Sequence, residues 1–372
     1  MRELRAWIVL GWAFVRYFSY RLGLGACPSF LAVYPEAVMV FDRIMKWPAR
    51  LRVEGAENCP RSGPAVFSAN HFAKDDPFIM YRAIHRLCEG SYPVRFMMRD
   101  DFFKSLGGVM KSRILDVDEL ARLVGSLQIS RDRVQLSQLK PFMTLLREAG
   151  SFIMYPGRSR SRTGVFIEYR DGIEEPGGVT FLIAQAQRGR PDLRVPAIPM
   201  ARTLNLVTRK SAIVFGPSIY LAHDADRTAQ RDMDFRLIEL MGDLVEVNAA
   251  HFVAGTVYLH CLHHRSCAIV PADLELAIAA ALGDLAHRRV DPALFAARRQ
   301  EIEAAFVFFE AEGLVVRSGA GFAPIRDRVL ATPPHDTTYR TLNPVKYTVN
   351  QVLHLLDVTE AIEQVFLKVC PN

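Results

Sequence analysis

Short apolar runs alternate with longer helical patterns through the middle of the chain, and this alternation restricts the fold more than any other feature. Apolar runs bounded by turn residues are typical of strands buried on both faces of a sheet. Helical patterns separate the runs, so we expect an α/β layer architecture with active-site loops at the strand ends. The expected strands are residues 64–68, 94–98, 152–155, 195–199 and 211–215, and the expected helices between them include 78–87 and 136–149.

The first 48 residues carry two amphipathic patterns. The apolar stretch 6–15 is shorter than the roughly 20 residues that a membrane-spanning helix needs. An aromatic face opposite arginines is typical of a helix that lies in the lipid headgroup layer, although an ordinary core helix would fit nearly as well. The second pattern covers 30–45 and stops before Trp47-Pro48. The aromatic face consists of Trp7, Trp12, Phe14 and Phe18. We expect 1–48 to be membrane-facing.

Helical periodicity dominates the chain beyond about residue 224. It is clearest at 235–247, 273–285 and 292–312, and a Gly-rich turn at 318–322 predicts a small hairpin. The polar stretch 331–341 is expected to be an exposed loop. We therefore predict a central domain, 49–222, followed by a mostly helical extension, 223–372.

The composition favours a partner that carries phosphate. The 46 Lys and Arg exceed the 40 Asp and Glu by six, and most of the basic residues are arginines, which bind phosphates with two parallel hydrogen bonds. An arginine-rich composition without a specific partner is an equal alternative. Because aromatic and basic residues do not interleave in one pattern, we expect no nucleic-acid partner. An apolar share of 50% without long apolar runs favours a membrane surface.

The cysteines follow no framework spacing, so reduced thiols are expected. The segment His260-Cys-Leu-His-His-Arg-Ser-Cys267 is nevertheless rich in metal-binding side chains, and on a helix His260 and His264 would share one face. No second ligand pair at metal-finger spacing occurs elsewhere in the sequence. We therefore expect no metal and no other cofactor.

A histidine and a carboxylate lie between an expected strand and an expected helix. His71 stands in the loop and Asp76 at its end. A carboxylate that binds one ring nitrogen fixes the tautomer, which leaves the other nitrogen to accept a proton from an attacking hydroxyl. Alternatively, Asp76 before Pro77 is a good helix N-cap, and His71 is a polar residue without a chemical role.

The residues around this pair resemble the glycerolipid acyltransferase superfamily, which contains glycerol-3-phosphate and 1-acylglycerol-3-phosphate acyltransferases. Its hallmark N-H-x-x-x-x-D appears here as Asn70-His71-Phe-Ala-Lys-Asp-Asp76. The resemblance implies a mixed sheet flanked by helices. It also implies that His71 is the general base, that Asp76 orients it, and that Asn70 belongs to the substrate-binding set.

Two further blocks of the resemblance imply residues that bind the phosphate of the acceptor. The segment 125–131 is similar to G-x-x-F-I-x-R, with Gly125 at its start and Arg131 as the phosphate ligand; a solvated arginine is the alternative. The segment 155–164 resembles F-P-E-G-T-R-S-R, but Gly157 stands where the family has glutamate. This departure puts the acceptor geometry in doubt. The implied phosphate ligands of this second segment are Arg158, Arg160, Ser161 and Arg162.

The remaining matches are a strand block and a C-terminal tract. Residues 195–199 are similar to V-P-V-x-P, which implies that Pro199 shapes the acyl-donor side. Residues 343–355 look like a tract of the larger glycerol-3-phosphate acyltransferases, although a plain amphipathic helix is equally consistent. This tract and the end of the arginine segment, 160–164, favour the glycerol-3-phosphate branch.

The sequence thus predicts an acyltransferase of phospholipid biosynthesis. We expect it to move a fatty acyl group from acyl-CoA or acyl carrier protein to a hydroxyl of glycerol 3-phosphate, on the cytoplasmic face of a membrane, as a peripheral protein. The alternatives are a lysophosphatidate or other lysophospholipid acyltransferase, and a non-catalytic lipid-binding relative that lost the motif glutamate.

Overall fold

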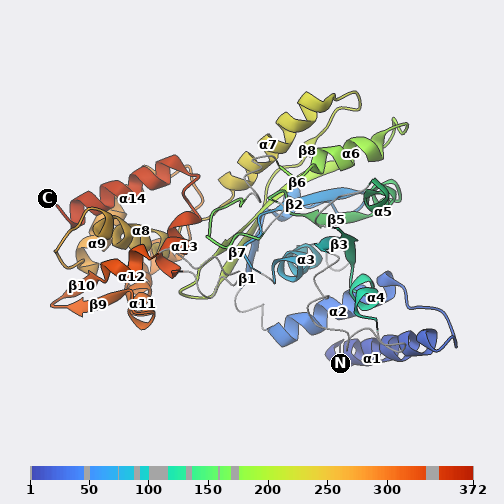
Figure 1. The fold of residues 1–372 in the computed structure, drawn as a ribbon, viewed down its shortest axis with the longest axis horizontal. Helices are drawn as coiled ribbons and strands as arrows, with labels where there is room; N and C mark the ends of the chain where they lie inside the picture. Colours follow the sequence, from blue (N-terminus) through green and yellow to red (C-terminus); the bar gives the residue numbers. More distant parts are fainter. Residues whose placement is uncertain are drawn as a thin grey trace.

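A mixed sheet of eight strands forms the centre of the molecule (Figure 1). The structure, a computed structural model, describes residues 2–45, 51–73, 75–87, 93–99, 116–130, 136–157, 160–168, 176–331 and 343–371. The strands are β1 (Leu51–Glu54), β2 (Ala65–Ala69), β3 (Val94–Arg99), β4 (Ser126–Ile129), β5 (Ser151–Met154), β6 (Pro196–Leu204), β7 (Ser211–Phe215) and β8 (Ile219–Tyr220). All five predicted strands are confirmed, and so is the α/β fold class. The sequence analysis missed β1, β4 and β8.

The strand order is β1-β7-β6-β2-β5-β3-β4, and β8 pairs with β6. Strands β6, β2, β5, β3 and β4 run parallel, so their carboxyl ends share one edge of the sheet. Strands β7 and β8 are antiparallel to β6, which makes the sheet mixed. Ser68, near the end of β2, pairs with Met154 of β5 and Pro199 of β6. The loops after β2 and β5 therefore begin side by side.

Both faces of the sheet are covered, which explains the continuous apolar runs. Within β2, Val66 belongs to one apolar cluster, whereas Ala65 and Phe67 belong to the other. Because side chains alternate between the faces of a strand, each face needs its own layer of helices. Helices α2 (Phe30–Met45) and α3 (Asp76–Leu87) pack on one side, with α5 (Leu136–Arg147), α6 (Val179–Gln187) and α7 (Arg227–Asp243) on the other.

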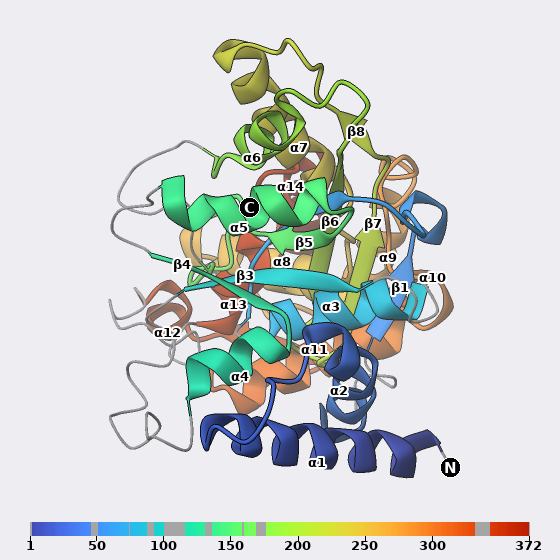
Figure 2. The same ribbon diagram turned by 90° about the vertical axis from the view of Figure 1, so that its right-hand side faces the viewer.

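Helix α1 (Arg2–Arg21) lies at the periphery of the molecule beside α2 and α4 (Val117–Leu123) (Figure 2). Its polar contacts hold it to α4: Arg21 forms an ion pair with Glu119 at 2.9 Å, and the Tyr17 hydroxyl donates to the Asp116 carbonyl at 3.1 Å. Both predicted N-terminal helices are present. None of the described helices combines the length and apolarity needed to cross a bilayer.

The C-terminal part is mostly helical and ends in a hairpin and three more helices. Its elements are α8 (Ala249–Leu262), α9 (Pro271–Ala281), α10 (Ala293–Ala296), α11 (Arg298–Ala311), β9 (Val315–Ser318), β10 (Gly321–Pro324), α12 (Arg326–Leu330), α13 (Pro344–Asn350) and α14 (Leu356–Val369). The predicted helices and hairpin are confirmed; nearly all of the predicted loop 331–341 lies outside the described residues. One apolar cluster joins these helices to the sheet, and the proposed domain boundaries stay predictions.

Helix α8 begins with a buried capping box that should make stability depend on pH. Asn248 accepts from the His251 amide, and the His251 ring accepts from the Asn248 amide. Burial, together with nearby His354, lowers the pKa of His251 to about 3. The unfolded chain takes up this proton below about pH 6.5, whereas the folded chain stays neutral. The stability contributed by the neutral ring is therefore complete above that pH and is lost as the pH falls.

We expect the free energy of unfolding to carry a His251 contribution of about 1.4 kcal/mol per pH unit between about pH 6 and 4. In His251→Gln this contribution disappears, so the variant's pH slope should be shallower by that amount, whatever its absolute stability. Urea unfolding of both proteins across this range measures the two slopes. Parallel slopes would contradict the assignment.

Candidate active site

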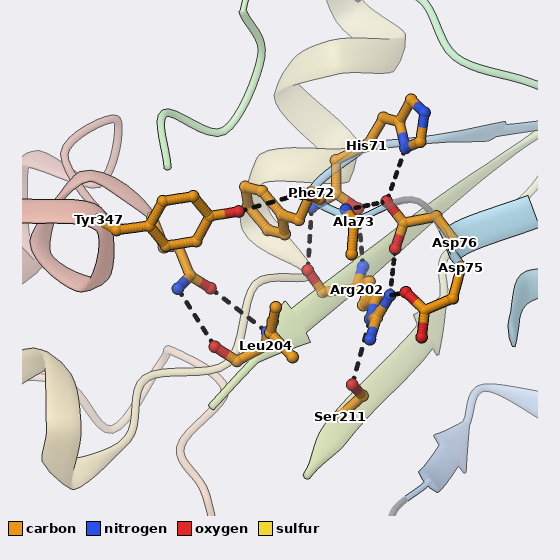
Figure 3. Close-up of polar contacts among 11 residues, drawn as sticks. His71, Phe72, Ala73, Asp75, Asp76, Arg202, Leu204, Ser211 and Tyr347 are labelled. Carbon is orange, nitrogen blue, oxygen red and sulfur yellow. Dashed lines mark hydrogen bonds and ion pairs between the residues drawn. The ribbon is translucent and has the colours of Figure 1, made fainter. Parts of the chain in front are cut away.

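The predicted catalytic pair is in direct contact at the carboxyl edge of the sheet (Figure 3). His71 follows β2, and its Nδ1 lies 2.7 Å from Oδ2 of Asp76. The Ala73 amide donates to the same oxygen, also at 2.7 Å. Asp76 is the first residue of α3, but its carboxylate binds these groups and a guanidinium rather than capping the helix. With Nδ1 engaged, Nε2 is the nitrogen left for proton transfer. The His71 side chain is 22% exposed, so substrate can reach it, whereas Asp76 is fully buried.

A buried arginine completes the charge arrangement beneath the histidine. Arg202 of β6 forms an ion pair with Oδ1 of Asp76 and a second one with Asp75 at 3.0 Å, and its Nε donates to Ser211 at 3.1 Å. Burial alone would raise the pKa of Asp76, but the Arg202 charge and the His71 hydrogen bond outweigh it and lower that pKa. Burial likewise disfavours the charged guanidinium, yet Asp76 and Asp75 raise the pKa of Arg202. Asp76 therefore stays ionised beside the imidazole.

Asn70 holds this arrangement in place. Its side chain is buried, with the amide donating to the Arg202 carbonyl at 2.9 Å and its oxygen accepting from the Arg202 amide at 2.8 Å. Through the Asn70 side chain, these two bonds extend the hydrogen bonding between β2 and β6 by one residue. They therefore fix the positions of the backbone at His71 and Arg202. The predicted substrate-binding role of Asn70 stays a prediction; in the structure its side chain is buried and bonds the Arg202 backbone.

The arginine segment lies against the catalytic loop. The Ser161 amide donates to the His71 carbonyl at 2.7 Å, and Tyr155, at the end of β5, stacks on the His71 ring at 4.4 Å between centroids. The hydroxyls of Ser161 and Tyr155 are buried and have no hydrogen-bond partner among the described residues. Buried polar atoms normally have partners, so these two hydroxyls beside His71 are candidates for contact with a ligand.

A glutamate later in the chain shapes this segment. Glu168 accepts from the Arg162 amide at 2.7 Å, from the Thr163 amide at 3.2 Å and from the Thr163 hydroxyl at 3.1 Å. The turn positions Arg160 and Arg162 on either side of Ser161. Arg131 and Arg158, also predicted to bind phosphate, lie outside the described residues.

The C-terminal tract contacts both loops of the site. Tyr347 of α13 donates its hydroxyl to the Phe72 carbonyl at 3.1 Å, and Asn350 donates to the Thr163 carbonyl at 2.7 Å. Gly164 has a φ of 88°, and a Cβ there would lie 2.2 Å from the Tyr347 carbonyl oxygen. Helix α13 therefore holds the catalytic loop and the arginine segment at a fixed separation, which a plain amphipathic helix would not do.

Two other predicted residues lie apart from the pair. Gly125 precedes β4, so it is at the opposite edge of the parallel strands from His71. Its φ is 103°, and a Cβ at this position would lie 2.8 Å from the Phe30 ring, so glycine is needed there for the backbone. Its predicted part in substrate binding stays a prediction. Pro199 lies within buried β6, where its carbonyl accepts from Gly216 at 2.8 Å. Its predicted role toward the acyl donor stays a prediction.

The comparison with protein families agrees with this site. Residues 50–201 match the model of the Acyltransferase family. The matched residues include β1 and end within β6. This segment is an acyltransferase domain, and the chain that carries it is an acyltransferase. The solved 1-acyl-sn-glycerophosphate acyltransferase PlsC from Thermotoga maritima is similar at 13% identity and a TM-score of 0.37, over 64% of this chain and 95% of that one. Likeness at this level does not bear on the substrate. No curated protein matches the chain significantly.

Three residues of the acyltransferase site were missed from the sequence: Arg202, Tyr155 and Glu168. Arg202 left a usable signal, because a charged residue that directly follows an apolar strand run needs a buried partner. Tyr155 was placed in its strand, but nothing in the pattern indicated that its ring would face His71. Glu168 lies outside every recognised block, so its contact with the arginine segment could come only from the fold.

The buried charges of this acyltransferase predict the effect of removing Arg202. Arg202→Leu leaves the buried Asp76 carboxylate without its cationic partner, so we expect unfolding to become easier by about 3–5 kcal/mol. The transfer rate should fall as well, because the carboxylate no longer stays reliably ionised beside the base. Urea unfolding and an acyl-transfer assay measure the two effects. Arg190→Leu, at an exposed position, is the control. Equal behaviour of the two variants would rule out the proposed charge arrangement.

The contact of α13 with the catalytic loop predicts a separate effect. Tyr347→Phe removes a hydrogen bond worth about 1 kcal/mol, so stability should change little. The transfer rate should fall by about tenfold or more, because small displacements of a base are costly to catalysis. Tyr258→Phe, which alters a half-buried tyrosine of α8, is the matched control. A rate equal to the control would mean that α13 does not position the loop.

Proposed function

We propose that this acyltransferase moves a fatty acyl group from a thioester, acyl-CoA or acyl carrier protein, to a hydroxyl of glycerol 3-phosphate in phospholipid synthesis. The observation that carries the proposal is the hydrogen bond between the Ser161 amide and the His71 carbonyl. It sets an arginine-containing turn directly beside a histidine that is oriented for proton transfer. A small acceptor that carries both a phosphate and a hydroxyl fits this spacing.

The His71–Asp76 pair supports direct transfer without an acyl-enzyme. Nε2 of His71 takes the proton from the acceptor hydroxyl as its oxygen attacks the thioester carbonyl. The tetrahedral intermediate collapses with cleavage of the C–S bond, and the imidazolium returns the proton to the departing thiolate. Asp76, kept ionised by Arg202, stabilises the imidazolium between these two steps. The acceptor gains an ester and the donor leaves as a free thiol.

Acceptor binding is assigned to the arginine segment. Arg160 and Arg162 flank Ser161, whose buried hydroxyl has no partner among the described residues. Two guanidinium groups and a hydroxyl suit a phosphate monoester, since charge-assisted bonds from arginine match its oxygens. Binding the phosphate there would place a glycerol hydroxyl near Nε2 of His71, which converts the attack into a step within one complex. Arg131 and Arg158 remain proposed partners of the same phosphate.

We also propose that the enzyme works at the cytoplasmic face of a membrane, attached by its N-terminal helices. Ten of the twenty exposed large apolar side chains in the described part of the chain fall in residues 2–45, including Trp7, Trp12 and Phe14. An apolar hollow of about 420 Å³ lies between α1, α2 and α4. Exposed aromatic residues on a peripheral helix suit insertion into the headgroup layer.

Purified protein, acyl-CoA and acyl carrier protein thioesters, and two acceptors test the function. We expect acylation of glycerol 3-phosphate and little acylation of lysophosphatidate, with release of one thiol per ester formed. His71→Gln should lower the rate by at least about 100-fold without unfolding the protein. The control His223→Gln alters an exposed histidine and should behave as the natural chain. Preference for lysophosphatidate would favour the rival acceptor, and a normal rate in His71→Gln would exclude the mechanism.

The same assay separates acceptor binding from chemistry. Arg160→Ala should raise the KM for glycerol 3-phosphate by about tenfold or more, because one charge-assisted contact is lost. The KM for the thioester should not change. Arg190→Ala, which removes an exposed arginine elsewhere, provides the comparison. An unchanged acceptor KM in Arg160→Ala would remove Arg160 from the phosphate site.

A further inference from the structure

Three metal-binding side chains meet at the far end of the C-terminal extension, away from the acyltransferase site. His260 comes from the last turn of α8, Cys267 from the loop before α9, and Cys370 from the residue that follows α14. One ligand atom from each lies within 4.8 Å of those of the other two. In Figure 1, α8, α9 and α14 gather near the C-terminus. The fold therefore brings Cys370 to a pair that is more than one hundred residues earlier in the sequence.

The packing around the three residues is already organised. Nε2 of His260 lies 2.8 Å from the Cys267 carbonyl oxygen, which holds the ring against the loop. His260 and Cys370 are buried, and Cys267 is half-buried, so the cluster has one accessible side. The Arg265 guanidinium lies over the Phe366 ring nearby, 5.9 Å from the ring centroid. All three residues of the cluster are outside the catalytic machinery described above.

The spacing suits a tetrahedral metal site. Zinc binds sulfur at about 2.3 Å and imidazole nitrogen at about 2.0–2.1 Å, which places ligand atoms roughly 3.5–3.8 Å apart. The three ligand atoms lie within 4.8 Å of one another, close to that range. A disulfide between Cys267 and Cys370 would use only the two sulfur atoms and leave Nε2 of His260 bonded to the Cys267 carbonyl oxygen, whereas a metal ion would use all three side chains.

The sequence expectation of no metal depended on the lack of a second ligand pair. In the structure, the histidines of this segment do not share one helix face, and the third ligand comes from another part of the chain. Helix α8 ends at Leu262, so His263 and His264 do not continue the face of His260. His263 stacks on Phe366 instead, and His264 contacts Arg326. The missing ligand comes from Cys370.

We propose that His260, Cys267 and Cys370 bind one thiophilic divalent metal ion, with zinc as the preferred ion. No fourth His, Cys, Asp or Glu joins the cluster in the part of the chain that the structure describes, so water fills the remaining position. Two thiolates balance the charge of the ion. The ion would connect the end of α14 to the end of α8, and α8 in turn packs against α13. The site does not depend on the proposed acyl transfer.

Metal binding is measured directly on the full chain. Protein stripped of metal with a chelator under reducing conditions is titrated with zinc against a coloured competitor, and separately with cobalt(II). We expect about one zinc per chain. Cobalt should give the near-ultraviolet thiolate-to-metal absorption and the visible bands of a tetrahedral site. The cobalt spectrum needs no variant, so it does not depend on how any substitution folds.

Substitutions then assign the ligands. Cys370→Ser and Cys267→Ser should each weaken zinc binding by at least about 100-fold and remove much of the thiolate absorption. Cys261→Ala, which alters a buried cysteine of α8 outside the cluster, and His263→Gln should bind zinc as the natural chain does. Zinc should raise the unfolding temperature of the natural chain and of both controls, but not that of the serine variants.

Three results would overturn the proposal. The first is the absence of bound zinc and of thiolate-to-cobalt absorption in the reduced natural chain. The second is zinc binding that survives both serine substitutions, which would place the metal elsewhere. The third is a Cys267–Cys370 disulfide in the protein as isolated, seen by mass spectrometry, without metal binding after its reduction. Acyl-transfer activity enters none of these readouts.

Discussion

The buried carboxylate of Asp76 is the interaction on which the acyltransferase site depends. A lone carboxylate in the interior would be protonated, because burial disfavours its charged form. Arg202 reverses this balance from below and His71 from above, while the Ala73 amide fixes the orientation. Asp76 therefore keeps the negative charge that orients and stabilises the imidazole, because Arg202 of β6 places a guanidinium beside it. Asn70, bonded to the backbone of Arg202, couples that strand to the histidine.

The sheet also explains how distant parts of the chain serve one site. The carboxyl ends of parallel strands lie at one edge of the sheet. Because β2 and β5 are paired and parallel, the loops that follow them begin close together. Their exact separation is less determined by the sheet, since both loops extend beyond it. Tyr347 and Asn350 of α13 bind one loop each. The C-terminal extension is therefore part of the catalytic geometry, although it lies outside the matched family segment.

The sequence could predict the sheet, the flanking helices and the His71–Asp76 pair, because each has a local signature: buried runs, helical periodicity, and a spaced motif. It could not predict contacts that depend on how the layers meet. Arg202 of β6 forms an ion pair with Asp76, which follows the neighbouring strand β2. Glu168 accepts a hydrogen bond from the arginine segment, and Tyr155 stacks on His71. The sequence also did not reveal the structural roles of two motif residues: Gly125 meets a backbone requirement, and the Asn70 side chain bonds the backbone of the neighbouring strand.

The glycine at position 157 can now be understood from its surroundings. A Cβ there would lie 3.1 Å from an Ile167 methyl group and 3.2 Å from the Glu168 carbonyl oxygen, so a glutamate side chain would have to displace the segment that returns past it. That returning segment carries Glu168, whose carboxylate accepts from the amides of Arg162 and Thr163. Gly157 and Glu168 therefore act together. Gly157 leaves room for the segment that carries Glu168, and the Glu168 carboxylate binds the turn at Arg162 and Thr163. With glycine at position 157, residues 160–164 lie beside the catalytic loop, where the Ser161 amide donates to the His71 carbonyl.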